Sequence, residues 1–414
     1  MKLIYRLISS LVYLFCRVYG HSRAKAGSEL WRGRLGLIKT NNTVDIWIHA
    51  SSVGETKVAT YLTDYLLSHK PDLRIYLSTM TEAGQKVART IAGKNVATGF
   101  LPLDHPSPLG RTLETLKPKM MVITETEIWP NLIGEVAKRN IEIVLVNGRM
   151  SDAAFRKYKI ARKMFRDILG RYQKLFLKTE ADKSRFEFFG VGTKDEQVIV
   201  AGDMKFDAPL LPRRAGRVQE IRSRLGASES DFLFVCGSTR PGEEQLLLEL
   251  ARTLKAEALP IKLVLAPRHI DRIKQLQEDL SVDGDSVGLY SERNLKSSLI
   301  LVDKMGCLND LYLAANLAFV GGTLVDIGGH NLLEPVWAGT PVLFGQSTGN
   351  VIEAKNYILE NNYGALVADV TEMTELVKKF ITGEITFSIK KSDDLSHSAT
   401  SIAGDYILQR LSDV

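Results

Sequence analysis

Glu55 stands where proton-transfer chemistry could be carried out, just after an apolar run and at the start of a helical pattern. The run, Trp47–Ala50, is typical of a strand, and the helix dipole favours an ionised carboxylate in the first turn that follows. A positioned, ionised carboxylate can accept a proton from a hydroxyl group, as a general base does. The alternative interpretation is an ordinary acid in the first turn of a helix.

A second acidic position is the pair Glu125 and Glu127, directly after another apolar run. Two carboxylates and Trp129 at one strand end would suit a sugar or hydroxyl site. The alternative is that Thr126 caps a helix and Glu127 lies in its first turn. Lys205 could offset negative charge that develops in a reaction, or it could be a solvated surface lysine.

Turns rich in glycine, hydroxyl and basic residues follow strands in the C-terminal half. Ser238 and Arg240 lie in one such turn, where backbone N–H groups can hold a phosphate and these side chains add donors. Arg268 ends the next expected strand. The glycine pairs at 321–322 and 328–329 indicate close backbone approach to a ligand, and Glu334 can accept hydrogen bonds from a ribose diol. Any one loop could be an ordinary turn, but three at the carboxyl ends of one sheet favour a ligand site.

Several other kinds of site are not indicated. Neither a P-loop nor a dinucleotide fingerprint occurs, and no Ser/His/Asp triad is indicated. His49, His269 and His330 lack metal-ligand spacing, so no metal or other cofactor is expected. The three cysteines imply no disulfide framework and fit a reducing compartment.

Composition is that of an ordinary globular protein, with 45% hydrophobic and 25% charged residues. The net charge of +6 belongs to the first 39 residues, which carry eight basic side chains and one acid, while the remainder sums to −1. Basic residues beside an apolar run suit an anionic phospholipid surface. Without zinc-finger spacing or a basic helix interleaved with aromatics, no nucleic-acid partner is expected.

Residues 1–20 are expected to form a membrane-anchor helix. The uninterrupted stretch between Arg6 and Arg17 is ten residues, whereas a spanning helix needs about twenty. Arg6, Ser10, Tyr13 and Arg17 recur at helical spacing, and apolar residues fill most of the rest, which is typical of a helix lying in the membrane interface. A signal peptide and a buried helix are the alternatives. The basic residues that follow favour the cytoplasmic side.

Short β-rich runs alternate with helical patterns from residue 44 onward, which predicts an α/β fold of two doubly wound, Rossmann-like domains. The expected strands of the first domain are Val44–Ala50, Arg74–Met80, Ala97–Leu103, Met120–Thr124, Glu142–Asn147, Lys174–Lys178 and Val198–Ala201. Those of the second are Phe232–Gly237, Lys262–Ala266, Val287–Tyr290, Leu299–Val302, Leu317–Val320, Pro341–Phe344 and Ala365–Val367. The expected boundaries are an anchor at 1–20, an N-terminal domain at 21–206, a linker at 207–230, a C-terminal domain at 231–393 and a helix at 394–414 that crosses back to the N-terminal domain.

Six motifs together resemble one enzyme family over nearly the whole chain. They are Trp47–Ala50 with Ser52–Glu55, Thr124–Asn131, Val146–Ser151, Gly237–Glu244, Ala266–His269 and Gly328–Pro335. The family is the 3-deoxy-D-manno-octulosonic acid (Kdo) transferases of lipopolysaccharide synthesis. The resemblance implies a GT-B fold with two domains facing across a cleft, the acceptor in the N-terminal domain and CMP-Kdo in the C-terminal one.

The resemblance also implies an activity and a location: transfer of Kdo from CMP-Kdo to a lipid A precursor (lipid IVA) at the cytoplasmic face of the cell inner membrane. Direct displacement of CMP by the lipid hydroxyl would invert the anomeric centre, so an inverting transferase is expected. It implies that Glu55 is the general base and that Glu125 and Lys205 support the transition state. The residues that would contact CMP are Pro267, Arg268, Met305, Gly306, Cys307, Asn331, Leu332, Leu333 and Glu334.

The chain departs from the family pattern at two positions. Cys307 stands where an acid is usual, which leaves backbone contacts there, and Leu332 stands where proline is usual, which changes the stiffness of the loop. Two other classes of function remain open. One is another GT-B enzyme, such as a UDP-sugar transferase or epimerase, and the other is a membrane-bound sugar-nucleotide binder without catalysis.

Overall fold

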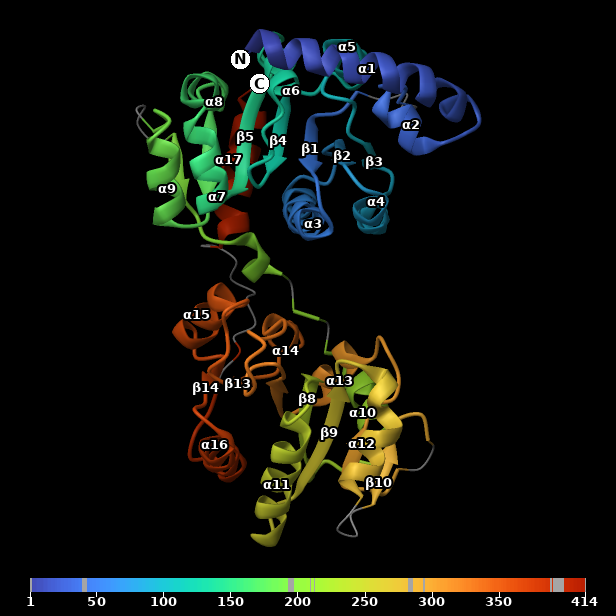
Figure 1. Cartoon of the computed structure of the whole chain (residues 1–414), viewed down its shortest axis with the longest axis vertical. Coiled ribbons are helices and arrows are strands. Elements are labelled where there is room, and N and C mark those ends of the chain that lie inside the picture. The colour runs from blue at the N-terminus through green and yellow to red at the C-terminus, as the bar shows by residue number, and fades with distance from the viewer. Residues whose placement is uncertain are drawn as a thin grey trace. The chain divides into compact units, whose positions relative to one another are not determined.

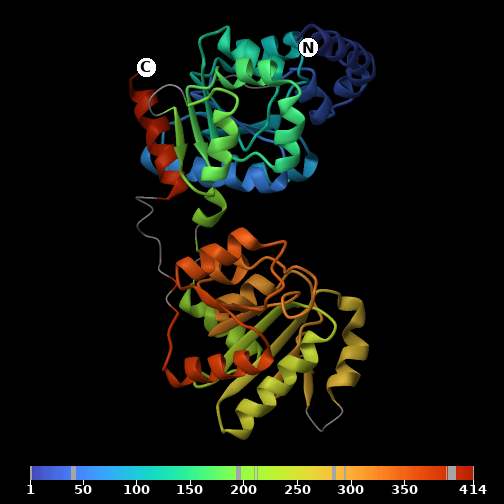
Figure 2. The ribbon, with the colours of Figure 1, turned by 60° about the vertical axis from the view of Figure 1, so that its left-hand side comes forward.

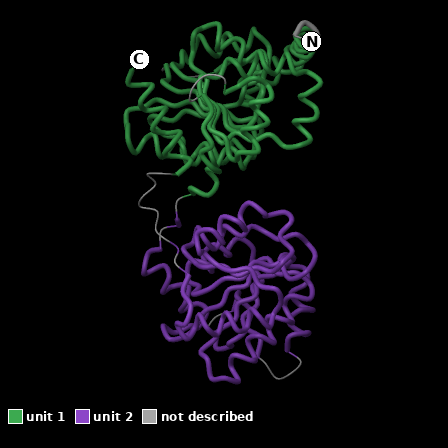
Figure 3. The backbone as a smooth tube through the Cα atoms, turned by 90° about the vertical axis from the view of Figure 1, so that its left-hand side faces the viewer, with its two compact units in different colours: residues 1–208, 394–414 green, residues 209–393 purple. Residues whose placement is uncertain are grey.

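The computed structural model describes residues 2–38, 43–192, 197–208, 210–211, 213–281, 286–292, 295–387, 389 and 398–413. The chain forms two compact units, residues 1–208 with 394–414 and residues 209–393 (Figure 3). Three features of the sequence prediction lie outside the described residues: Lys39, the linker prolines Pro209 and Pro212, and the first residues of the C-terminal segment, 394–397.

The first unit is built on a seven-stranded parallel sheet with the strand order β3-β2-β1-β4-β5-β6-β7. The strands are β1 (Ile46–Ala50), β2 (Ile75–Thr79), β3 (Val96–Phe100), β4 (Met120–Thr124), β5 (Glu142–Gly148), β6 (Lys174–Leu177) and β7 (Val198–Val200). The helices are α1 (Lys2–Lys25), α2 (Glu29–Arg34), α3 (Val53–His69), α4 (Glu82–Ala88), α5 (Pro106–Leu116), α6 (Pro130–Ala137), α7 (Asp152–Lys159), α8 (Arg162–Leu169), α9 (Glu180–Glu187) and α17 (Ala399–Ser412), with short 3-10 helices η1 (Arg89–Ile91) and η2 (Met204–Asp207).

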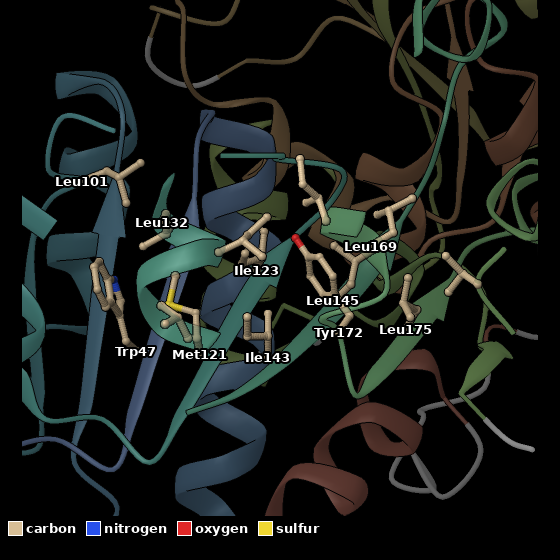
Figure 4. Close-up of a cluster of buried hydrophobic side chains, with 14 of the residues drawn as sticks. Trp47, Leu101, Met121, Ile123, Leu132, Ile143, Leu145, Leu169, Tyr172 and Leu175 are labelled. Atoms are coloured by element: carbon tan, nitrogen blue, oxygen red, sulfur yellow. The ribbon is translucent and has the colours of Figure 1, made fainter. Parts of the chain in front are cut away.

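Helices cover both faces of this sheet, because its central strands are apolar on both sides. β1 and β4 are buried at every position, and alternate residues of one strand point to opposite faces. Trp47 and Met121 belong to the cluster under α5, α6 and α8 (Figures 1 and 4). Their neighbours Ile48 and Val122 belong to the cluster under α3 and α17. Because all seven strands run parallel, their carboxyl ends lie at one edge of the sheet.

The C-terminal helix α17 is part of the first unit and packs on α3 (Figure 2). Ala403 and Ile407 are buried in the same cluster as Leu62 of α3. Gly404 allows this close packing, because a Cβ there would lie 2.4 Å from the ring of Tyr65. The last segment of the chain therefore completes the core of the domain in which the chain starts.

The second unit has its own seven-stranded parallel sheet, with the order β10-β11-β9-β8-β12-β13-β14. The strands are β8 (Phe232–Thr239), β9 (Ile261–Pro267), β10 (Val287–Leu289), β11 (Leu299–Leu301), β12 (Leu317–Val320), β13 (Val342–Phe344) and β14 (Gly364–Leu366). The helices are α10 (Ala215–Arg224), α11 (Glu243–Ala256), α12 (Ile273–Leu280), α13 (Leu308–Ala314), α14 (Leu333–Trp337), α15 (Ile352–Glu360) and α16 (Val370–Thr382), with a short 3-10 helix η3 (Ile270–Arg272).

The segment 207–230, expected to be a linker, contains a helix that belongs to the second unit. In and just after α10, Ile221 and Leu225 lie four residues apart on one helical face and are buried in a core cluster with Val235 of β8. Arg222 adds hydrogen bonds to the carbonyls of Ala314 and Asp231, at 3.1 and 2.6 Å. The connection is therefore shorter than the charged composition of this segment indicated, because two apolar positions were enough to dock the helix.

The predicted fold class, α/β with two doubly wound parallel sheets, is confirmed. Every expected strand corresponds to an observed one, and β4 and β12 have the predicted bounds. The differences at the other strands are one to three residues at an end, where a sequence pattern is least informative.

Candidate active site

The loop between β1 and α3 places Glu55 at the head of α3. Ser52 caps the helix, since its Oγ accepts a hydrogen bond from the Glu55 N–H at 3.3 Å. In return the Glu55 carboxylate accepts the Ser51 N–H at 2.7 Å and the Ser52 hydroxyl at 2.9 Å. This reciprocal arrangement is a variant of the capping box. Glu55 thus has the structural role of a first-turn acid, and the same bonds fix its carboxylate at the carboxyl end of β1.

Burial raises the proton affinity of Glu55. The residue is only 8% exposed, and the loss of hydration raises the pKa of its carboxyl group above the ordinary value. The hydrogen bonds from Ser51 and Ser52 lower this pKa in part, while the negative charge of Glu125 raises it further. The sequence indicated only the helix dipole, which favours ionisation, and burial outweighs it. A carboxylate with a raised pKa is a stronger base, as a general base requires.

Glu127 is a second carboxyl group whose pKa is raised, first by burial and then by the charge of Glu55. Its Oε2 accepts the indole N–H of Trp129 at 2.9 Å. The alternative in which Thr126 caps a helix is wrong, because α6 begins only at Pro130 and Thr126 bonds instead to the main chain after β5. The acidic pair therefore lies in an irregular loop at the strand end.

Glu125 lies between two lysines. Its Oε1 is 3.3 Å from Lys205 Nζ and 3.6 Å from Lys178 Nζ. Lys178 follows β6, is buried, and also pairs with Asp203 at 2.9 Å. Lys205 reaches the first turn of α3, where its Cε is 4.0 Å from the position of a Cβ on Gly54. The structure thus brings together the three residues predicted to act in catalysis.

Backbone strain accompanies this group of charges. Glu125 has a φ of 55°, in the left-handed region, which costs a residue with a side chain about 1–3 kcal/mol. Asn147 has the same φ, and its Oδ1 accepts the Met204 N–H at 2.9 Å. That bond ties η2, which carries Lys205, to the end of β5. Strained residues persist where their surroundings fix them, and here they aim Glu125 and hold Lys205.

Six of the residues predicted to bind the donor line one cavity of the second unit. The cavity, of about 80 Å³, lies at the carboxyl ends of β8, β9 and β11, which are neighbours in the sheet. The six are Ser238, Pro267, Arg268, Met305, Gly306 and Cys307. Ligand sites for small molecules usually measure about 300–1,000 Å³, so this cavity can receive one part of a nucleotide sugar.

Cys307 offers this cavity a neutral thiol. Its Sγ lies 3.2 Å from the carbonyl oxygen of Lys304, to which the thiol donates, and burial raises the pKa of the thiol. The acid that is usual at this position would carry a charge. The loop 305–307 therefore has no charged side chain, and its Gly306 is in a left-handed conformation at φ 82°.

Arg240 lies in a basic cluster formed by the loops that flank the cavity. Its Nε–H donates to His330 Nε2 at 3.0 Å, and its Nη1 lies 2.8 Å from His269 Nε2. Because a guanidinium can only donate, each imidazole accepts at Nε2 and carries its proton on Nδ1. Burial and the charges of Arg240 and Arg268 lower the pKa of His330, which favours this neutral form.

The loop 331–334 lies beside this basic cluster, and its residues are not among those that line the cavity. Asn331 accepts the Leu333 N–H and donates to Glu334, both at 3.2 Å. Leu332 is completely buried and Leu333 nearly so, so that only their main-chain groups remain for a ligand. His330 connects this loop to Arg240.

A carboxylate of the protein itself occupies the first glycine pair. Glu243 is buried and accepts four main-chain N–H bonds, from Arg240, Gly322, Thr323 and Leu324 at 2.8, 2.8, 3.1 and 3.0 Å. A Cβ on Gly321 would lie 2.7 Å from Glu243 Oε2. The predicted close approach at this pair is therefore made by Glu243 rather than by a ligand. The carboxylate ties the loop after β12 to the loop after β8.

α1 lies along the first unit with one side docked. The Tyr5 hydroxyl donates to Asp104 at 2.5 Å, and the Tyr13 ring stacks on His105 with the ring centres 4.2 Å apart. The opposite side is apolar, and its residues are each more than half exposed: Leu7, Leu11, Leu14, Phe15 and Val18. The predicted polar face is only partly correct, because Tyr13 docks while Arg6, Ser10 and Arg17 are exposed.

No helix in the described ranges is long and apolar enough to cross a membrane. Within the same ranges, no group of three or more His, Cys, Asp or Glu side chains could hold a metal ion.

Two charged residues of the site were missed by sequence reasoning. Lys178 ends an expected strand, and a lysine directly after an apolar run at the carboxyl edge was the available signal. Glu243 follows a glycine turn, and nothing in the sequence indicates that its carboxylate turns toward a loop some eighty residues further along.

Comparison with known proteins places the chain among sugar transferases. The family model described as 3-Deoxy-D-manno-octulosonic-acid transferase (kdotransferase) matches residues 29–208. The 3-deoxy-D-manno-octulosonic acid transferase of Chlamydophila psittaci is 31% identical over 80% of this chain and 76% of its own length. A bifunctional glycosyltransferase/methyltransferase of Fusobacterium nucleatum is 35% identical over 80% of this chain, which spans 52% of that relative.

Solved structures identify the fold. UDP-GlcNAc 2-epimerase from Neisseria meningitidis matches 89% of this chain and 100% of its own, with a TM-score of 0.58 and 12% identity. At that identity the likeness concerns the fold alone, which is the GT-B fold of two Rossmann-like domains.

The raised pKa of Glu55 predicts how its replacement by glutamine affects stability at different pH. When an acid has a higher pKa in the folded than in the unfolded state, the protein loses stability as the pH rises from the unfolded-state pKa to the folded-state pKa. Glu55→Gln removes that loss. The free energy of unfolding of the variant, measured relative to that of wild type, should therefore be higher at pH 8 than at pH 4, where the acid is largely neutral in both states. Urea unfolding followed by tryptophan fluorescence measures this, since Trp31, Trp47 and Trp129 all lie in the first unit.

The matched control for that measurement is Glu82→Gln, which removes an exposed acid from the first turn of α4. If the free energies of unfolding of Glu55→Gln and wild type differed by the same amount at both pH values, the raised pKa of Glu55 would be contradicted.

Proposed function

Because the chain belongs to the 3-deoxy-D-manno-octulosonic acid (Kdo) transferase family of glycosyltransferases, we propose that it transfers Kdo from CMP-Kdo to a hydroxyl group of a lipid A precursor such as lipid IVA. The observation that carries the proposal is the group around Glu55 in the first unit. It combines a buried carboxylate of raised pKa with the Glu125–Lys205 pair beside it.

In the proposed reaction Glu55 takes the proton of the attacking lipid hydroxyl. The hydroxyl oxygen bonds to the anomeric carbon of Kdo while the bond from that carbon to the CMP phosphate oxygen breaks. A positioned general base contributes roughly 10²–10⁴-fold to such a step. A single displacement inverts the anomeric centre, and retained configuration in the product would exclude it.

The departing CMP gains negative charge, which the second unit is equipped to stabilise. Ser238 and Arg268 line its cavity, and the main-chain groups of the loop 305–307 are there as well. Preorganised donors of this kind act on charge that develops in the transition state. In the first unit, Glu125 holds Lys205 near the base, where its positive charge favours the anionic form of the substrate oxygen.

The direct test uses labelled CMP-Kdo and a tetraacylated lipid A precursor. Wild type should form a Kdo-lipid product, and Glu55→Gln should lose about 10²-fold or more of kcat, as expected for a general base. Glu82→Gln, the exposed acid at the head of α4, should keep wild-type activity. CMP should compete with the donor and UDP should not, which distinguishes this enzyme from GT-B enzymes that use UDP-sugars.

Two outcomes would count against the proposal. Folded wild-type enzyme that forms no product would show that donor or acceptor has been misassigned. Full activity of Glu55→Gln would keep the reaction but assign the base elsewhere.

We also propose that α1 attaches the enzyme to the cytoplasmic face of the cell inner membrane. A docked helix with an exposed row of Leu, Phe and Val has the form of an interfacial helix, and Arg23 and Lys25 in its last turn suit anionic headgroups. This attachment would hold the enzyme close to a lipid acceptor, so that only CMP-Kdo arrives by diffusion.

Vesicle binding tests the attachment. Leu11→Ser with Phe15→Ser should weaken binding to vesicles of phosphatidylethanolamine and phosphatidylglycerol at least about 10-fold. Full burial of each side chain contributes about 1.5–3 kcal/mol, so even partial burial of the two exceeds the roughly 1.4 kcal/mol that a tenfold change requires. The control is Ile160→Ser, which removes an apolar side chain that lies between α7 and α8 and is even more exposed than Leu11 and Phe15. Equal losses in both variants, or none in the first, would refute the role of α1. In cells, the wild type should sediment with the inner membrane.

A further inference from the structure

We propose that Arg240, held between His330 and His269, binds the carboxylate of the donor sugar, while Arg268 binds the phosphate. The inference rests on the proposed function, because it takes CMP-Kdo as the donor. It assigns to the second unit two adjacent anion subsites with different roles.

The chemistry of the donor calls for two such subsites. The sugar is a 2-ulosonic acid, so its anomeric carbon carries both the carboxylate and the oxygen that links it to the CMP phosphate. Two negative charges are thus separated by a few bonds. Burying either anion without a partner is costly, and guanidinium groups bind carboxylate and phosphate with paired N–H donors.

The structure offers two guanidinium groups at neighbouring loops. Arg268 lines the cavity with Ser238 and the loop 305–307, whereas Arg240 is not among the residues that line it. The Arg268 N–H donates to the carbonyl of Thr239 at 3.0 Å, so the loops that carry the two arginines are joined. Both positive charges act on His330, which places them near the same side chain.

Arg240 is oriented before any ligand binds. His330 and His269 accept from its Nε and Nη1 at 3.0 and 2.8 Å and so use two of its five N–H groups. An arginine fixed in this way loses less conformational freedom on binding an anion. Its own backbone N–H donates to the buried Glu243, which fixes the start of the side chain as well.

The two subsites should act at different stages of the reaction. The phosphate gains charge as the bond to CMP breaks, so Arg268 stabilises the transition state and the CMP product. The carboxylate keeps its charge throughout, so Arg240 contributes equally to donor binding in the ground state and the transition state. Loss of such uniform binding raises KM and leaves kcat almost unchanged.

Kinetics with CMP-Kdo as substrate and CMP as product inhibitor separates the two roles, since CMP carries phosphate but no sugar carboxylate. Arg240→Ala should raise the KM for CMP-Kdo about 10- to 100-fold, with kcat and the Ki of CMP changed less than about twofold. Arg268→Ala should raise the Ki of CMP and lower kcat. The control is Arg217→Gln, which removes an arginine of α10 whose ion pairs with Glu220 and Asp310 lie at the surface.

His330 supplies a second test, because it acts through Arg240. His330→Gln keeps a side-chain acceptor and should raise the donor KM less than His330→Leu, which removes it, with the Ki of CMP unaffected in both. Thermal unfolding of each variant confirms that it is folded.

Two results would overturn the inference. If the Ki of CMP rose as much as the donor KM in Arg240→Ala, Arg240 would bind the phosphate. If neither changed, Arg240 would not touch the donor. Wild type that transferred no Kdo would instead contradict the proposed function, so the two failures can be distinguished.

Discussion

Removal of carboxylates from water at the carboxyl ends of the two sheets is the constraint on which the rest of the structure depends. A buried acid must be satisfied by hydrogen bonds or take up a proton. Glu55 and Glu243 stand at corresponding places. Glu55 lies in the first turn of α3, which follows β1, and Glu243 begins α11, which follows β8. Burial raises the pKa of both carboxyl groups. Glu243 has no exposure and four main-chain N–H partners, about the full capacity of a carboxylate, so it holds two loops together. Glu55 is slightly exposed and is held by Ser51 and Ser52, so it is fixed in place and still able to exchange a proton.

Basic groups also lie at the strand ends of both units, and their placement decides what each region can do. In the first unit Glu125 pairs with Lys205 and Lys178, so its own charge is compensated while it still raises the pKa of Glu55. In the second unit the guanidinium of Arg240 is held by neutral imidazoles, and its charge is available to an anion. This difference supports the proposed roles, in which the first unit removes a proton from the acceptor and the second binds the anionic donor.

Much of this could be predicted from the sequence, because the signals are local. Short β-rich runs of three to seven residues marked every strand, and parallel strands place the residues that follow them at one edge, which is why Glu55 and Glu125 come together. The same argument gathered Ser238, Pro267 and Arg268 around one cavity. What could not be predicted depends on contacts between distant segments. Tertiary packing buries Glu55, brings Lys178 beside Glu125 and lets Glu243 accept the N–H of Gly322. The side of α1 that contacts the first unit depends in the same way on the positions of Asp104 and His105.

The central claim is that Glu55, with a pKa raised by burial and by the charge of Glu125, is the base. The pH dependence of kcat/KM tests it most directly, because it reports the ionisation of the free enzyme. The account predicts an acidic limb in wild type that moves to lower pH in Glu125→Gln, since loss of that negative charge makes Glu55 easier to ionise, while the residual activity of Glu55→Gln lacks this limb. A limb that stays at the same pH in Glu125→Gln, or that persists in Glu55→Gln, would contradict it.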